Sequence, residues 1–133
     1  MKSVHLIDLP KFLDPRGNLT FAQSDSQLPF SLKRVFWTYD VPGGAIRGGH
    51  AYREQEEVVI ALSGSFEVVV TRVDSSTRRF TLNRSFQGLY LPPLTWRHME
   101  NFSTNALIFH LASTHFSEGD YIYDFDDYVR HSV

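Results

Sequence analysis

Cysteine is absent from this chain of 133 residues, and its absence removes three kinds of chemistry. The protein can form no disulfide, no thiolate zinc site and no thiol nucleophile. A strong net charge is lacking as well, because thirteen basic side chains oppose fifteen acidic ones and leave a formal charge of -2. This balance gives no electrostatic reason to expect nucleic acid or an anionic membrane as a partner.

Long apolar runs are also missing. No window approaches the roughly 20 consecutive apolar residues that a membrane span needs. The N-terminal stretch MKSVHLIDLPKFLDPRGN contains no apolar run of the kind found in signal peptides. We therefore expect a soluble, cytoplasmic protein without a membrane partner.

Aromatic residues, in contrast, are plentiful, with eleven Phe and six Tyr. Aromatic side chains suit pleated, half-buried surfaces, so the composition favours an all-β protein. Proline and glycine are scattered as turn signals, and there is no repeat or linker, which indicates one domain over residues 1–133.

Short segments with strand-like alternation follow one another at regular spacing, which is typical of a sandwich or barrel. The stretches 57–64 and 65–73 suggest a β-hairpin that turns at Ser63 and Gly64. Tyr121, Phe125 and Tyr128 recur at helical spacing, so we predict a short C-terminal helix that covers one end of the barrel. The other expected strands are residues 3–8, 18–24, 32–41, 78–83, 88–93, 95–101 and 106–113.

Part of a cupin metal-site motif stands in residues 44–64. Gly44, His50, Glu57 and Gly64 have the motif's spacing, but Tyr52 takes the place of its second histidine. A looser match to the second cupin motif places His98 after a proline corner. The two matches, in order and joined by strands, predict a cupin jelly-roll barrel.

We expect no metal at this site. Such a centre needs about three imidazole or carboxylate ligands, and only His50 and Glu57 remain of the first motif. Tyr52 would have to ionise from a pKa near 10. Arg97, beside His98, would add a fixed positive charge that repels a cation.

Successive blocks of the sequence carry a more specific resemblance. DPRGNL, PFSLKRVFWTYDVPGG, RGGHAYREQEEVVIALSGSFEVVV, LNRSFQGLYLPPLTWRHMENFS and LASTHFSEGDYIYDFDDY resemble the dTDP-4-keto-6-deoxyglucose 3,4-ketoisomerases over nearly the whole chain. The resemblance implies a metal-free jelly roll and a homodimer with exchanged strands. It also implies a part in making 3-amino-3,6-dideoxysugars for surface glycans.

The implied reaction moves a ketone from C4 to C3 of a dTDP-linked 4-keto-6-deoxy sugar through an enediol. The electrons stay within the substrate, so no cofactor is expected. His50 matches the family's general base, and histidine has a suitable pKa; otherwise it is a barrel histidine satisfied by its neighbours. A helper tyrosine of the relatives aligns with Phe36 or Trp37, neither of which can relay a proton. Tyr52 either takes over that role or only packs.

Three arginines are candidates for binding the substrate diphosphate, because guanidinium matches phosphate oxygens in bidentate fashion. They are Arg16, Arg47 and Arg97, and each could instead be an ordinary surface residue. The resemblance links the Arg16 and Arg97 positions to the gluco or galacto configuration of the product. This chain mixes the two patterns, so the product stays open.

Four further residues complete the expected substrate site. Trp37 and Tyr39 could stack on thymine or sugar faces, although we expect Trp37 to belong to the core instead. Glu56 and Glu57 begin a strand, so one of them should point inward, and His98 follows from the second motif.

Two alternatives to the isomerase remain: a non-catalytic sugar-nucleotide-binding cupin, and a 3,5-epimerase. The epimerase's usual set of histidine, aspartate and opposed tyrosine is not found at the expected spacing.

Overall fold

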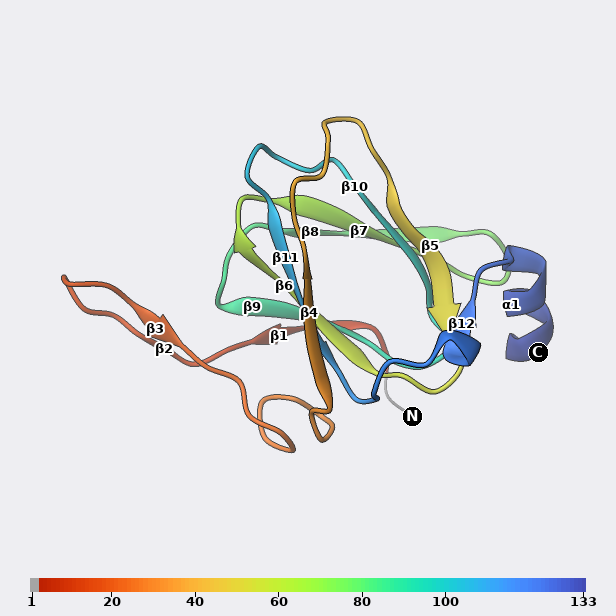
Figure 1. Cartoon of the computed structure of the whole chain (residues 1–133), viewed down its shortest axis with the longest axis horizontal. Helices are drawn as coiled ribbons and strands as arrows, with labels where there is room; N and C mark the ends of the chain where they lie inside the picture. The colour runs from red at the N-terminus through yellow and green to blue at the C-terminus, as the bar shows by residue number, and fades with distance from the viewer. Residues whose placement is uncertain (1–2) are drawn as a thin grey trace.

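The computed structural model describes residues 3–133, which form two five-stranded antiparallel sheets facing each other (Figure 1). The first sheet contains, in spatial order, β1 (His5–Asp8), β9 (Gln87–Leu91), β6 (Glu57–Ser63), β11 (Leu107–Ala112) and β4 (Arg34–Thr38). The second contains β12 (Tyr121–Ile122), β5 (Arg47–Tyr52), β10 (Trp96–Glu100), β7 (Phe66–Thr71) and β8 (Thr77–Leu82). These antiparallel sheets, with one short helix at the C-terminus, confirm the predicted cupin jelly roll.

The core lies between the two sheets, because every second residue of a strand points inward. Phe66, Val68, Leu89 and Ile108 are among its members, and each is almost fully buried. Burying one such side chain contributes about 1.5–3 kcal/mol. A second cluster, which includes Val58, covers the outer face of the first sheet beneath the segment that precedes β4.

The predicted hairpin of residues 57–64 and 65–73 is wrong. β6 pairs with β9 and β11, whereas β7 pairs with β8 and β10 in the other sheet. The chain changes sheet at Gly64, whose φ is +67°, and a Cβ there would lie 2.4 Å from Ser103 Oγ. Alternation shows which residues point inward but does not name the neighbouring strand, so the sequence pattern could not distinguish a hairpin from this crossing.

The predicted C-terminal helix is α1 (Phe125–Ser132), which begins where the Asp124 side chain accepts a hydrogen bond from the Asp126 backbone. It follows the short 3-10 helix η1 (Glu118–Asp120) and strand β12. We expected this helix to cover one end of the barrel. It packs instead on the outer face of the second sheet. There Trp96 contacts Phe125, with ring centroids 5.4 Å apart. Within residues 3–133, no helix has the length and apolar character that crossing a bilayer requires.

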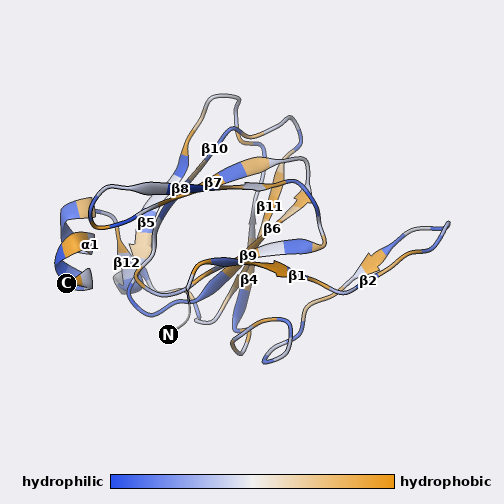
Figure 2. Ribbon diagram, turned by 180° about the vertical axis from the view of Figure 1, so that it is seen from behind, coloured by the Kyte–Doolittle hydropathy of each residue, from blue (hydrophilic) through white to orange (hydrophobic). Residues whose placement is uncertain are grey.

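A two-stranded arm projects from the barrel. It consists of β2 (Lys11–Phe12) and β3 (Leu19–Thr20), and both views show it extending away from the sheets (Figures 1 and 2). The predicted turn at DPRG closes it, with the Gly17 backbone N–H donating to the Asp14 carbonyl. Figure 2 colours part of the arm hydrophobic, and Leu13 is 74% exposed. The arm therefore presents apolar surface that its own chain does not cover.

Candidate functional site

A cavity of about 290 Å³ lies between the two sheets. β4, β6 and β11 form one wall, and β5, β10 and β12 form the other. The cavity therefore gathers side chains that are far apart in the sequence. Its lining residues are Phe36, Thr38, Arg47, Gly48, His50, Tyr52, Glu57, Arg97, Met99, His110, Tyr121 and Tyr123.

His50 reaches the cavity from β5. Gly48, two residues earlier, has a φ of +93° and faces the register shift between Arg97 and His98 in the neighbouring strand. The His50 ring meets the edge of Tyr52, with centroids 4.9 Å apart. Burial, together with the positive charge of Arg97, lowers the pKa of His50 to about 4. Its imidazole is therefore neutral near pH 7 and free to accept a proton.

Tyr52 lies beside His50 and is only 2% exposed. Burial, the negative charge of Glu57 and a hydrogen bond with Tyr121 all raise the pKa of Tyr52 above its ordinary value. The two tyrosine rings are in contact, with centroids 4.6 Å apart. Tyr52 therefore keeps its proton at neutral pH and can act as a hydrogen-bond donor, but not as a metal ligand.

Arg97 enters the cavity from β10 and is 1% exposed. Its Nη1 lies 3.4 Å from Glu57 Oε1, and its guanidinium lies 4.9 Å from the centre of the Tyr52 ring. Its Nε and Nη2 are buried without a hydrogen-bond partner among the described residues. A buried charged donor of this kind is costly unless it is paired, so it is suited to an oxygen of a bound ligand.

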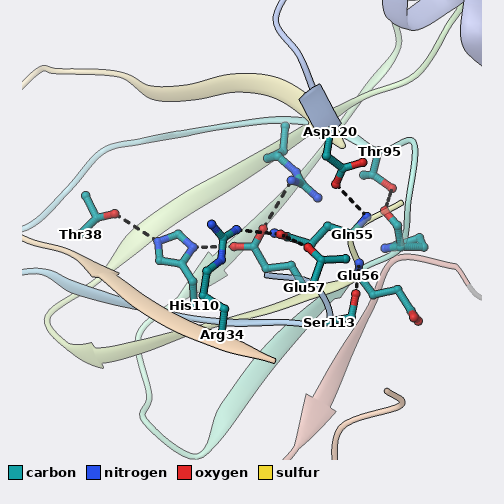
Figure 3. Close-up of polar contacts among 12 residues, drawn as sticks. Arg34, Thr38, Gln55, Glu56, Glu57, Thr95, His110, Ser113 and Asp120 are labelled. Carbon is teal, nitrogen blue, oxygen red and sulfur yellow. Dashed lines mark hydrogen bonds and ion pairs between the residues drawn. The ribbon is translucent and has the colours of Figure 1, made fainter. Parts of the chain in front are cut away.

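Glu57 connects Arg97 to a third polar residue, His110, which lies on the wall opposite Arg97. Figure 3 shows the contacts of Glu57 with His110 and of His110 with Thr38. Glu57 Oε2 lies 2.5 Å from His110 Nδ1, and His110 Nε2 lies 3.1 Å from Thr38 Oγ1. Phe36 stacks on the His110 ring, with centroids 4.2 Å apart. Burial opposes ionisation of Glu57, but the hydrogen bond with His110 and the charge of Arg97 outweigh it and lower the pKa of Glu57 to about 2.

Five of the nine residues expected at the site line this cavity: His50, Tyr52, Arg47, Arg97 and Glu57. Arg47 is the exposed member of this group, whereas Glu57 and Arg97 are buried. The inward glutamate of the expected pair is thus Glu57. The structure brings these residues together, and their roles remain predictions.

His98, Trp37 and Tyr39 lie elsewhere. His98 follows the inward-pointing Arg97, so strand alternation turns it outward, where its Nε2 lies 2.6 Å from Glu100 Oε1. Trp37 and Tyr39 point away from the cavity and are 55% and 62% exposed. The expectation that Trp37 belongs to the core is wrong, because Phe36 and Thr38 take the inward positions of β4.

Arg16 lies in the turn of the projecting arm. Its side chain is 90% exposed, and its Nη2 lies 2.9 Å from Asp14 Oδ2. It does not line the cavity of its own chain.

Sequence reasoning missed several cavity residues. Of these, His110 is the one whose side chain is best suited to proton transfer. A signal was available, because His110 shares its strand face with Ile108 and Ala112, which are both fully buried. A histidine on the inward face of a jelly-roll strand is a candidate for chemistry. The other unexpected lining residues are Thr38, Gly48, Met99, Tyr121 and Tyr123.

The positions that a cupin would use for metal ligands carry other groups here. Tyr52 replaces one histidine, and the inward place on β10 holds Arg97. Across residues 3–133, no three His, Cys, Asp or Glu side chains are grouped so that they could hold a metal ion. The absence of a metal stays a prediction.

Comparison with known proteins finds 3,4-ketoisomerases that share about a third of their residues with this chain. A family model described as "FdtA: WxcM-like, C-terminal" matches residues 2–132. A TDP-4-oxo-6-deoxy-alpha-D-glucose-3,4-oxoisomerase of Aneurinibacillus thermoaerophilus is 33% identical over 95% of this chain and 90% of its own length.

Two solved structures are similar over nearly the whole chain. A sugar 3,4-ketoisomerase of Thermoanaerobacterium thermosaccharolyticum, QdtA, in complex with TDP, has a TM-score of 0.92 and 32% identity, and covers 96% of this chain and 92% of its own. A 3,4-ketoisomerase of Helicobacter canadensis has a TM-score of 0.92 and 33% identity, over 98% of this chain and 97% of its own.

Proposed function

Because this chain belongs to the FdtA family of sugar 3,4-ketoisomerases and is an isomerase, we propose that it converts a TDP-4-keto-6-deoxyhexose into the 3-keto isomer, with His50 as the base. The observation that supports this most directly is the half-buried His50 ring in the cavity, whose pKa of about 4 keeps it unprotonated. Relatives of this length bind TDP or act on TDP-sugars, as their names state.

The proposed chemistry begins at C3, whose proton the neighbouring C4 ketone acidifies. His50 removes this proton, and the electrons move into a C3–C4 double bond and onto the C4 oxygen. The two unpaired nitrogens of Arg97, Nε and Nη2, are available to donate to the negative oxygen, and donors are most effective in a buried site of this kind. His50 then returns a proton to C4 while the C3 ketone forms. No redox cofactor enters this scheme.

The cavity size fits this substrate. A volume of about 290 Å³ is at the lower end of ligand pockets and suits a hexose better than a whole nucleotide sugar. The sugar would occupy the cavity, and the diphosphate would lie near the exposed guanidinium of Arg47. Tyr52 can donate a hydrogen bond to a sugar oxygen from beside His50.

Incubation with TDP-4-keto-6-deoxyglucose in deuterated water tests the proposal. We expect the ketone to move to C3, with deuterium at C4 of the product and at C3 of recovered substrate, as NMR would show. Exchange at C3 and C5 without migration would instead show a 3,5-epimerase. A binding protein would exchange neither position but would melt at a higher temperature with TDP present.

We also propose that the arm of one copy lies on a second copy, which gives a homodimer with exchanged strands. The support is the apolar surface of the arm, including Phe12 at 62%, Leu13 at 74% and Leu19 at 57% exposure. The outer face around Trp37, with Tyr39, Leu62, Leu107 and Phe109, is another uncovered apolar patch of the same chain. Exposed apolar patches of this kind mark interaction surfaces, and exchange would carry Arg16 to the partner.

Changing both Leu13 and Leu19 to aspartate should therefore convert the dimer into monomers, because charge on the arm opposes its burial. Light scattering coupled to gel filtration measures the mass. Val73→Asp is the matched control, since Val73 is 40% exposed but lies outside the arm. A wild-type monomer, or a double variant that remains dimeric, would contradict the proposed exchange.

The product also suggests a place among reactions. A 3-keto sugar nucleotide is the carbonyl that a transaminase would turn into a 3-amino sugar, which agrees with the expected role in deoxyamino sugars for surface glycans. The charged diphosphate of the substrate agrees with a cytoplasmic location.

A further inference from the structure

Moving a ketone to the adjacent carbon requires two proton transfers. One proton passes from C3 to C4, and another passes from the hydroxyl oxygen on C3 to the oxygen on C4. His50 accounts for the carbon-bound proton. The oxygen-bound proton needs a group that can both accept and donate within hydrogen-bond reach of two neighbouring oxygens.

We propose that Thr38, His110 and Glu57 form a relay that carries the oxygen-bound proton, on the cavity wall opposite His50. This inference rests on the proposed function. Thr38 comes from β4, His110 from β11 and Glu57 from β6, whereas His50 comes from β5 of the other sheet. All four line the same cavity.

The hydrogen bonds give the relay its direction (Figure 3). A carboxylate 2.5 Å from His110 Nδ1 holds the proton on that nitrogen. With the proton on Nδ1, His110 Nε2 is left to accept the hydrogen of Thr38 Oγ1 at 3.1 Å. A hydroxyl, an imidazole and a carboxylate in this order form the arrangement that activates a hydroxyl in other enzymes.

The packing around the relay fixes its geometry. Phe36 stacks on the His110 ring with an angle of 8° between the planes, so the imidazole has one orientation. His110 is 6% exposed and Glu57 is 2% exposed, which leaves the half-buried Thr38 hydroxyl as the outer end of the chain. The reactive end of the relay is therefore a side chain that a bound sugar can touch.

The proton balance closes without any further reactant. After His50 has removed the C3 proton, Thr38 Oγ gives its own proton to His110 Nε2 and takes the proton of O3–H, with Glu57 stabilising the charged ring. Thr38 Oγ then gives the proton that came from O3 to O4, and His110 returns the original proton to Thr38. The C3 ketone then forms as C4 takes its proton from His50. Thr38 and His110 end as they began.

Thr38→Val tests the relay, because it keeps the branched shape of the side chain and replaces the hydroxyl with a methyl group that cannot transfer a proton. In deuterated water, His50 should still exchange the C3 proton of the substrate, while product formation slows. We expect the ratio of C3 exchange to ketone migration to rise by at least about tenfold. His110→Gln should raise the same ratio. Thr38→Ser keeps a hydroxyl, so its ratio should be close to that of the wild type.

A merely structural role would lower exchange and migration together, so an unchanged ratio in Thr38→Val would overturn the relay. The melting shift with TDP confirms that each variant still folds and binds. A wild-type protein that moves no ketone would refute the proposed function itself. A wild-type protein that isomerises normally beside an unchanged ratio would refute the relay alone.

Discussion

Replacing His50 with asparagine is expected to lower kcat by about 10²–10⁴-fold, the range that a positioned general base contributes. Asparagine keeps a similar size and can still hydrogen bond, but it cannot accept the C3 proton at neutral pH. Deuterium exchange at C3 should therefore disappear together with ketone migration. Binding of TDP should remain, because the nucleotide would lie outside the cavity that holds His50. NMR of the sugar and a thermal shift with TDP measure the two effects.

His98→Asn is the matched control. It makes the same chemical change on a strand of the same sheet, but His98 faces outward and contacts Glu100 instead of the cavity. Its activity should stay close to that of the wild type. If His50→Asn kept C3 exchange, another group would be the base. If the His98 variant were equally inactive, the orientation of β10 would need revision.

The pH dependence of kcat/KM follows from the same residue. His50 must be unprotonated to act as a base, and its pKa is about 4 because of burial and the charge of Arg97. The rate should therefore be independent of His50 protonation near neutral pH and should fall as the pH decreases through about 4. His50 thus gives up basicity, since an ideal base has a pKa near the working pH, and gains a constant charge state.

Strand alternation carried most of what could be predicted from the sequence. Alternation within the expected strand 32–41 puts Phe36 and Thr38 on the face opposite to Trp37, which is how they lie in β4. The spacing of the partial cupin motif grouped His50 with Glu57, and both line one cavity. The first inference depends only on the two-residue period of a strand, which local sequence reports directly. The second depends on matching the spacing of a known motif. Family resemblance supplied the reaction, which no periodicity could have given.

The wrong predictions share a cause. Local sequence pattern does not report which side chains from distant strands meet across the two sheets. His98 and Arg97 were both expected at the site, but neighbouring residues of a strand point to opposite faces, and only Arg97 lines the cavity. Trp37 was expected in the core, but it lies on the outer face of β4 and is 55% exposed. His110 was missed because its partners, Glu57 and Thr38, are 53 and 72 residues away in sequence.

Glu57→Ala is expected to lower the free energy of unfolding by about 3–5 kcal/mol, the cost of breaking a buried ion pair by removing one partner. Arg97 would be left with a buried charge, since its exposed fraction is 1% and its Nε and Nη2 already lack partners among the described residues. His110 would lose the acceptor for its Nδ1 proton. Denaturant unfolding measures the change.

Arg79→Ala provides the contrast. Its guanidinium also lies near carboxylates, at 3.6 Å from Glu67 and Glu100, but its side chain is 51% exposed. Exposed pairs contribute at most about 1 kcal/mol, so this variant should unfold close to the wild type. Glu57→Gln should fall between the two, because its amide oxygen can still accept from His110 while the charge is lost.

Acid gives an independent measure of the same interaction. The pKa of Glu57 is lowered from 4.5 to about 2, so this group binds fewer protons in the folded state than in the unfolded state. Its stabilisation is fully present above pH 4.5 and is lost as the pH falls through about 2. The stability difference between wild type and Glu57→Gln should therefore shrink across that window. A difference that stays constant from neutral pH to pH 2 would mean that Arg97 and His110 do not hold the carboxylate ionised. The contacts of Glu57 across the cavity would then not include an ion pair.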